Sequence, residues 1–195
     1  MTIHSHDILP ATGRPFVAVC GISCQSQADR AVSFGARCLV FDFVPIHLHA
    51  ISAEHAARIS SANVSRVGSF VAGDFSGIRE TMKRARLDFA VLHGACDPVA
   101  ASWALGRERI VRALSAATVT QEETDIWAPH CAAFKIGIES EQDVARLAGL
   151  AMAHPWIISP AKRVYAEKVR RPDGIELISA DRAALLRDIL ELSAI

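Results

Sequence analysis

The sequence has neither an excess of charge of one sign nor a long apolar run. Its 195 residues carry 21 lysines and arginines against 21 aspartates and glutamates, so the formal net charge is zero. Proteins that bind nucleic acids or anionic membrane surfaces usually carry a basic excess, and a membrane helix needs about 20 consecutive apolar residues. The composition therefore predicts no nucleic-acid partner and no membrane partner.

Sequence signatures of cofactors and disulfides are also missing. The chain contains no Gly-x-Gly-x-x-Gly motif and no P-loop, so we expect no cofactor. Its five cysteines include no Cys-x-x-Cys pair, which is typical of reduced thiols in the cytoplasm. Residues 1–15 lack the basic start and apolar centre of a signal peptide. We interpret them as a leader before a single domain over residues 16–195.

Apolar runs alternate with segments of helical spacing along the whole chain. Eight strand–helix units predict a (β/α)₈ TIM barrel, and because such barrels typically have about 250 residues, its loops must be short. A doubly wound open sheet is the alternative that periodicity does not exclude. The predicted strands are Phe16–Cys20, Cys38–Phe43, Arg66–Val71, Asp88–His93, Arg109–Leu114, Cys131–Ile138, Trp156–Ser159 and Gly174–Ser179.

Helix starts are marked by residues whose side chains cap free backbone N–H groups. Ser26, Ser52 and Ser140 each precede a segment of helical spacing, and Asp97 and Ser159 are each followed by a proline. Serine and aspartate are favoured at the N-cap, and proline fits the first helical turn. These residues therefore predict helices between the strands.

The first predicted strand ends on a cysteine, Cys20, followed by Gly21. The last residue of such a strand points out of the carboxyl end of the sheet, where α/β proteins carry out chemistry. A free cysteine is also among the most commonly buried residues. The stretch alone is therefore compatible with a packing residue or with a catalytic thiol.

The order of motifs in the first half resembles the phosphoribosylanthranilate isomerase family. The carrying stretches are Ala18-Val19-Cys20-Gly21, the segment FGARCLVFDFVPIHLHAISAEHAARI (residues 34–59), Val67-Gly68-Ser69-Phe70-Val71 and Val91-Leu92-His93-Gly94. Four ordered motifs at matching spacing make this a fairly specific signal. The resemblance implies a (β/α)₈ barrel and a small-molecule substrate, a phosphorylated sugar.

The second half departs from the family pattern. In AAFKIGIESEQDVARL (residues 132–147), Gly137 stands where the family has an aspartate, and the following glycine-rich loop is missing. The segment WIISPAK (156–162) lacks the family's Gly-Gly, and His49 replaces an arginine. The last strand keeps a carboxylate at Glu176 but loses the terminal glycine.

The resemblance implies an Amadori rearrangement that converts an aminoaldose phosphate into an aminoketose. It gives Cys20 the role of general base, and it places the general acid at Gly137, which has no proton to donate. Asp42 or Glu139 could stand in as the acid. We therefore expect an isomerase of this family with weakened or altered activity, and a catalytically inactive paralogue that binds small molecules or partners is the alternative.

The substrate phosphate is expected at helix N-termini after the last two strands. The family's glycines are absent there, but Ser159 and Ser179 remain, with Lys162 nearby. The predicted substrate-binding residues are Gly21, His49, His93, Arg112, Lys135, Ser159 and Ser179. We expect a monomer or a homodimer.

Several charged residues interrupt the apolar strands. Asp42, Arg112, Lys135 and Glu176 could form a charge-balanced layer inside the barrel, because buried charges need partners. Lys135 on the sixth strand also resembles the lysine of Schiff-base barrel aldolases, whose neutral amine is the nucleophile. Both interpretations of Lys135 are left open by the sequence.

Three histidines lie at predicted strand ends. His47 and His49 form a His-x-His pair that, with Asp42 or His93, has donor types suited to a divalent metal. No carboxylate-rich motif follows, so we interpret the pair as loop histidines and predict no metal. His93 either contacts the substrate or is a hydrogen-bonded core histidine.

Overall fold

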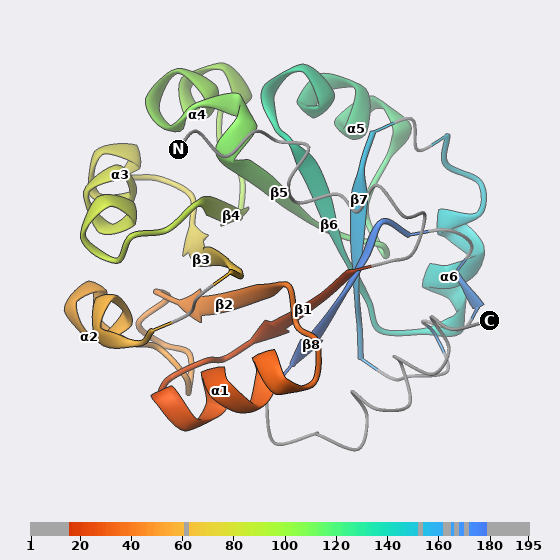
Figure 1. Ribbon diagram of the computed structural model, residues 1–195. Helices are drawn as coiled ribbons and strands as arrows, with labels where there is room; N and C mark the ends of the chain where they lie inside the picture. Colours follow the sequence, from red (N-terminus) through yellow and green to blue (C-terminus); the bar gives the residue numbers. More distant parts are fainter. Residues whose placement is uncertain are drawn as a thin grey trace.

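The computed structural model describes residues 16–60, 63–151, 154–161, 165, 168–169 and 172–178. Within them, eight parallel strands close into a barrel in chain order, with helices around the outside (Figure 1). The ring is closed by pairing of β1 with β8, from Phe16 opposite Gly174 to Cys20 opposite Ile178. The predicted TIM barrel is confirmed, and the open sheet is excluded.

The strands agree with the predicted ones to within about two residues at each end. They are β1 Phe16–Cys20, β2 Cys38–Asp42, β3 Ser65–Val71, β4 Phe89–His93, β5 Ile110–Ser115, β6 Ala133–Ile138, β7 Trp156–Pro160 and β8 Gly174–Ile178. The largest difference is at β6, which begins at Ala133 rather than Cys131 because its ladder with β5 starts at the Val111–Ala133 pair.

The helices begin where the capping residues predict, with two exceptions. Ser52 and Asp97 accept hydrogen bonds from backbone N–H groups of α2 and α4, and Ser140 forms a capping box in α6. One is α1, which is preceded by Cys24 rather than Ser26. The other is Ser159–Pro160, which ends strand β7 instead of starting a helix, because both residues pair with β6. The helices are α1 Gln25–Ser33, α2 Ala53–Arg58, α3 Phe75–Arg84, α4 Pro98–Leu105, α5 Gln121–Trp127 and α6 Glu141–Leu147, with 3₁₀ turns at Arg107–Arg109 and Ala128–His130.

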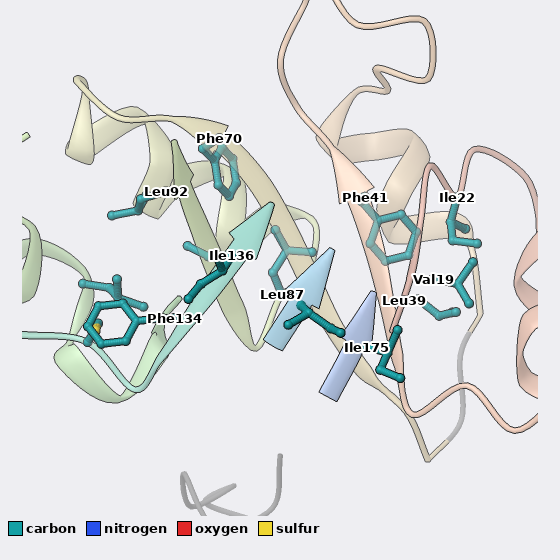
Figure 2. Close-up of a cluster of buried hydrophobic side chains, with 14 of the residues drawn as sticks. Val19, Ile22, Leu39, Phe41, Phe70, Leu87, Leu92, Phe134, Ile136 and Ile175 are labelled. Atoms are coloured by element: carbon teal, nitrogen blue, oxygen red, sulfur yellow. The ribbon is translucent and has the colours of Figure 1, made fainter. Parts of the chain in front are cut away.

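Each strand has two apolar faces because successive side chains alternate between the barrel interior and the helices. The larger cluster lies between strands and helices and includes Phe41 and Phe134, part of which Figure 2 shows. A second cluster fills the barrel interior below its carboxyl end, towards the amino-terminal ends of the strands, with residues such as Val40, Phe89 and Val91. The packed lower interior leaves the carboxyl end of the barrel as the place for a site.

Two expectations fall partly outside the described residues. The predicted leader over residues 1–15 lies outside them, as does the end of the predicted domain after residue 178. Among the helices that the structure describes, none has the length and apolar character needed to cross a membrane.

Candidate active site

Polar side chains replace apolar ones at the carboxyl end of the barrel interior. The strand register places them above the inner apolar cluster, on interior positions of seven strands. These residues line the carboxyl end of the barrel interior, which we call the mouth: Cys20, Asp42, Ser69, His93, Lys135, Ser159 and Glu176. The barrel therefore concentrates potential chemistry at the end where TIM barrels have their active sites.

Lys135, Glu176 and Ser159 form a connected group on the floor of this mouth. The Lys135 ammonium lies 2.6 Å from the Glu176 carboxylate, and the Ser159 hydroxyl donates a 2.9 Å hydrogen bond to the same carboxylate oxygen. Burial lowers the pKa of Lys135, but the charge and hydrogen bond of Glu176 together with Cys20 and Asp42 raise it by more, so the net pKa is raised. A protonated amine is no nucleophile, so this geometry opposes the Schiff-base interpretation.

Asp42 is held by its own loop. One carboxylate oxygen lies 2.6 Å from Nδ1 of His47, and the other accepts a 2.9 Å hydrogen bond from the Val44 backbone N–H. Asp42 is 7% exposed, whereas the His47 side chain is 48% exposed. Because both carboxylate oxygens are occupied, Asp42 is poorly placed to donate a proton to a substrate.

His49 contributes to the mouth by packing over Gly21. A Cβ placed on Gly21 would lie 3.3 Å from Cδ2 of His49, and Gly21 has φ of +79°, so glycine suits this close approach. His47 bonds to Asp42 instead of pairing with His49. Among the described residues, no group of three or more histidines, cysteines or carboxylates is arranged to hold a metal.

His93 is paired with Ser69 across neighbouring strands. Its Nε2 lies 3.1 Å from the Ser69 hydroxyl oxygen. Burial lowers the pKa of His93 to about 4, and the nearby Lys135 charge acts in the same direction. The imidazole is therefore neutral near pH 7 and offers a hydrogen bond rather than a charge.

Cys20 lies at the end of β1, as predicted, and packs against the inner cluster. Burial raises the pKa of its thiol to about 12, and the Glu176 charge adds to the effect. Lys135 and the Gly21 N–H act in the opposite direction. All five cysteines are free thiols. Near pH 7 Cys20 is thus a thiol rather than a thiolate.

A cavity of about 420 Å³ opens between the carboxyl ends of β4 and β7. It is lined by His93, Lys135, Gly137, Glu139 and Ser159, among others. A Cβ placed on Gly137 would lie 3.8 Å from its nearest neighbour, a backbone carbonyl oxygen. Gly137, where the resemblance places the general acid, therefore faces open space, and the exposed Glu139 borders the same cavity.

Arg112 does not belong to this site, which corrects the expectation of an interior charge layer containing it. It faces the helices, because its strand neighbours Val111 and Ala113 face the interior. Its guanidinium stacks over Trp127 and donates hydrogen bonds to the carbonyl oxygens of Leu92 and Gly94. Arg112 therefore holds the carboxyl end of β4 from the side of the strand that faces the helices.

The predicted phosphate residues are only partly described. Ser159 borders the cavity, but its hydroxyl is used by Glu176. Ser179 and Lys162 lie outside the described residues. Sequence reasoning did not single out Ser69, although its position two residues before the end of β3 marks it as an interior residue at the mouth.

Comparison with known proteins gives a consistent family. No family model matches the chain. It is 32% identical over 181 residues to N-(5'-phosphoribosyl)anthranilate isomerase of Desulfovibrio desulfuricans, covering 84% of each chain. A crystal structure of phosphoribosyl anthranilate isomerase from Thermus thermophilus superposes with a TM-score of 0.77 at 23% identity, covering 91% of this chain and 98% of that one.

A second solved structure is the isomerase in complex with reduced 1-(o-carboxyphenylamino)-1-deoxyribulose 5-phosphate. It superposes with a TM-score of 0.74 at 20% identity, covering 92% of this chain and 98% of that one. At such identities the structural matches establish the barrel fold, and the sequence match to the Desulfovibrio protein establishes the relationship. The chain belongs to the phosphoribosylanthranilate isomerase family.

Proposed function

We propose that this protein isomerises N-(5'-phosphoribosyl)anthranilate, slowly, with Cys20 as the general base. Family membership supports the reaction. The observation that carries the base role is the position of Cys20 at the end of β1, where it faces the polar groups of the mouth. A cytoplasmic enzyme of tryptophan biosynthesis is the corresponding role in the cell.

The reaction needs two proton transfers. A base removes the proton from the carbon next to the aminated carbon, and an acid protonates the ring oxygen as the sugar opens. With a pKa of about 12, about one Cys20 in 10⁴ is ionised at pH 8. Because the thiolate is the active base, this small fraction supports the expectation of slow proton removal.

The second transfer lacks its usual donor, since Gly137 has no side chain. Asp42 is occupied by His47 and Val44, whereas Glu139 borders the cavity and is exposed. Glu139 is therefore the better stand-in for the acid. A missing general acid typically costs about 10²–10⁴ in rate, which again supports a slow enzyme.

The test follows the loss of phosphoribosylanthranilate fluorescence with purified wild type, Cys20→Ala and Glu139→Gln. We expect slow turnover by wild type, none by Cys20→Ala and a reduced rate for Glu139→Gln. Cys96→Ala is the matched control, because Cys96 is a half-buried thiol outside the mouth. Turnover that persists in Cys20→Ala would refute the base assignment.

A second candidate function is a binding protein without catalysis. It is favoured by the loss of the acid at Gly137 together with the neutralised Lys135–Glu176 pair. In that case wild type and Cys20→Ala bind the reduced product analogue equally and neither turns over substrate. Turnover by wild type that depends on Cys20 excludes this candidate.

A further inference from the structure

Lys135 is the one lysine or arginine among the described residues that face the barrel interior. It lies at the boundary between two environments. Above it is the cavity of about 420 Å³, and below it a small space of about 20 Å³ lined by the inner cluster, Lys135 and Glu176. A buried cation at this height acts on any ionisable group of the mouth, because little water screens it.

Cys20 is the nucleophilic group beside the partner of this cation, because β1 and β8 pair in parallel with Ala18 opposite Glu176 and Cys20 two residues further along β1. The charged groups around Cys20 are Glu176 from β8, Lys135 from β6 and Asp42 from β2. His93 from β4 is neutral near pH 7, and His47 sits on the outer side of Asp42, half exposed. Two carboxylates therefore oppose ionisation of the thiol, and Lys135 is the cation that favours it.

We propose that Lys135 is a positioning residue for Cys20: its ammonium stabilises the Cys20 thiolate, and Glu176 holds that ammonium in place while weakening its effect. The 2.6 Å contact with Glu176 fixes where the ammonium lies. The hydrogen bond from Ser159 fixes the carboxylate in turn. The reactivity of Cys20 is thus set by an ion pair between β8, the strand paired with β1, and β6.

The electrostatic balance makes this arrangement adjustable. Removing the charge of Glu176 leaves the Lys135 ammonium free to pair with a thiolate, so the thiol should ionise more readily. Removing Lys135 in that background takes the benefit away again. Replacing Lys135 by arginine keeps the charge and should keep most of the benefit.

The proposal rests on the proposed function only in giving Cys20 a purpose, and thiol reactivity measures it without substrate. Cys20 is alkylated with iodoacetamide between pH 6 and 10 in wild type, Glu176→Gln, Glu176→Gln/Lys135→Met and Glu176→Gln/Lys135→Arg. Peptide mapping resolves Cys20 from the other cysteines. Cys96 is an internal reference, and the buried Cys38 and Cys131 report any opening of the barrel.

We expect Glu176→Gln to raise the alkylation rate of Cys20 at pH 8 by about tenfold or more, since one pKa unit is a factor of ten in thiolate. Lys135→Met in that background should remove the gain, and Lys135→Arg should retain most of it. Equal Cys20 rates in Glu176→Gln and its Lys135→Met derivative would overturn the proposal. A silent isomerase assay with this pattern intact would refute only the proposed function.

A second measurement leaves Glu176 unchanged. Alkylation of Cys20 is compared in wild type, Lys135→Arg and Lys135→Met at pH 9–10. We expect Lys135→Met to lower the rate, because two carboxylates then oppose the thiolate without a cation, and Lys135→Arg to keep most of it. Equal rates in Lys135→Arg and Lys135→Met would contradict the proposal even if Glu176→Gln failed to fold.

Discussion

Lys135 of β6 and Glu176 of β8 meet inside the barrel with 2.6 Å between the ammonium and the carboxylate. Glu176 is 3% exposed, so neither charge is well hydrated. Such a pair adds little net stability, because desolvation offsets much of its attraction, but it fixes where the charge lies. The Lys135–Glu176 pair keeps the lysine protonated. The charges of both residues also act on the ionisation of Cys20.

Restoring the acid should restore activity. Gly137→Asp places a carboxyl group in the open cavity, where a Cβ has no close neighbour, and we expect a gain in turnover of up to about 10²-fold. The fluorescence assay measures it, with Gly137→Asn as the control of equal size that carries no acid. An equal gain in both variants, or a gain that survives Cys20→Ala, would contradict the role of Gly137 as the acid position.

Binding of the phosphoribosyl ligand should be weak. The glycines that typically hold the phosphate are absent from this sequence, and the Ser159 hydroxyl is already bonded to Glu176. Calorimetric titration with reduced 1-(o-carboxyphenylamino)-1-deoxyribulose 5-phosphate should therefore give little heat at micromolar concentrations. Tight binding would show that other groups hold the phosphate, and the same titration with Ser159→Ala would then test Ser159.

Lys135 should not form a Schiff base. Its pKa is raised by Glu176 despite burial, so the amine stays protonated at neutral pH and cannot attack a carbonyl. Borohydride added with small aldehydes or ketones should trap no adduct on Lys135 by mass spectrometry, with Lys135→Met as the blank. Stoichiometric labelling at Lys135 would move the protein to the aldolase class.

Acid should destabilise the fold through His93. Its pKa is lowered to about 4 in the folded chain, whereas an unfolded histidine titrates near 6.5. Between these values the unfolded state binds the additional proton, so stability falls as pH drops from about 6.5 to 4. The loss is at most about 3 kcal/mol.

Urea unfolding at several pH values measures this loss. His93→Gln should flatten the pH dependence, whereas His55→Gln, at an exposed histidine of α2, should leave it unchanged. A His93→Gln protein with the same acid sensitivity as wild type would mean that other groups are responsible.

Arg112 should matter for stability more than for binding. It is 6% exposed, stacks over Trp127 and holds the carbonyl oxygens of Leu92 and Gly94. Arg112→Met should cost about 2–4 kcal/mol of unfolding free energy, because buried acceptors lose a charged donor. Arg84→Met, at an exposed arginine paired with Glu54 and Glu80, should cost about 1 kcal/mol or less.

Much of the fold was predictable from local patterns. The eight strands lie within about two residues of their predicted limits, because buried parallel strands are short apolar runs bounded by helix signals. Ser52, Asp97 and Ser140 cap helices as predicted, because capping involves only neighbours in the chain. The position of Cys20 at the carboxyl end follows from the same local reasoning.

The contacts inside the mouth depended on tertiary structure. The Lys135–Glu176 ion pair and the Ser69–His93 hydrogen bond join different strands, so they depend on strand register and on closure of the barrel. Arg112 shows the same limit: both faces of β5 are apolar, and periodicity does not say which face is inside. Local sequence specifies the strands and helices and the alternation of side chains between the two faces of each strand. Closure of the barrel determines which charged side chains meet, and these charges influence the ionisation of Cys20.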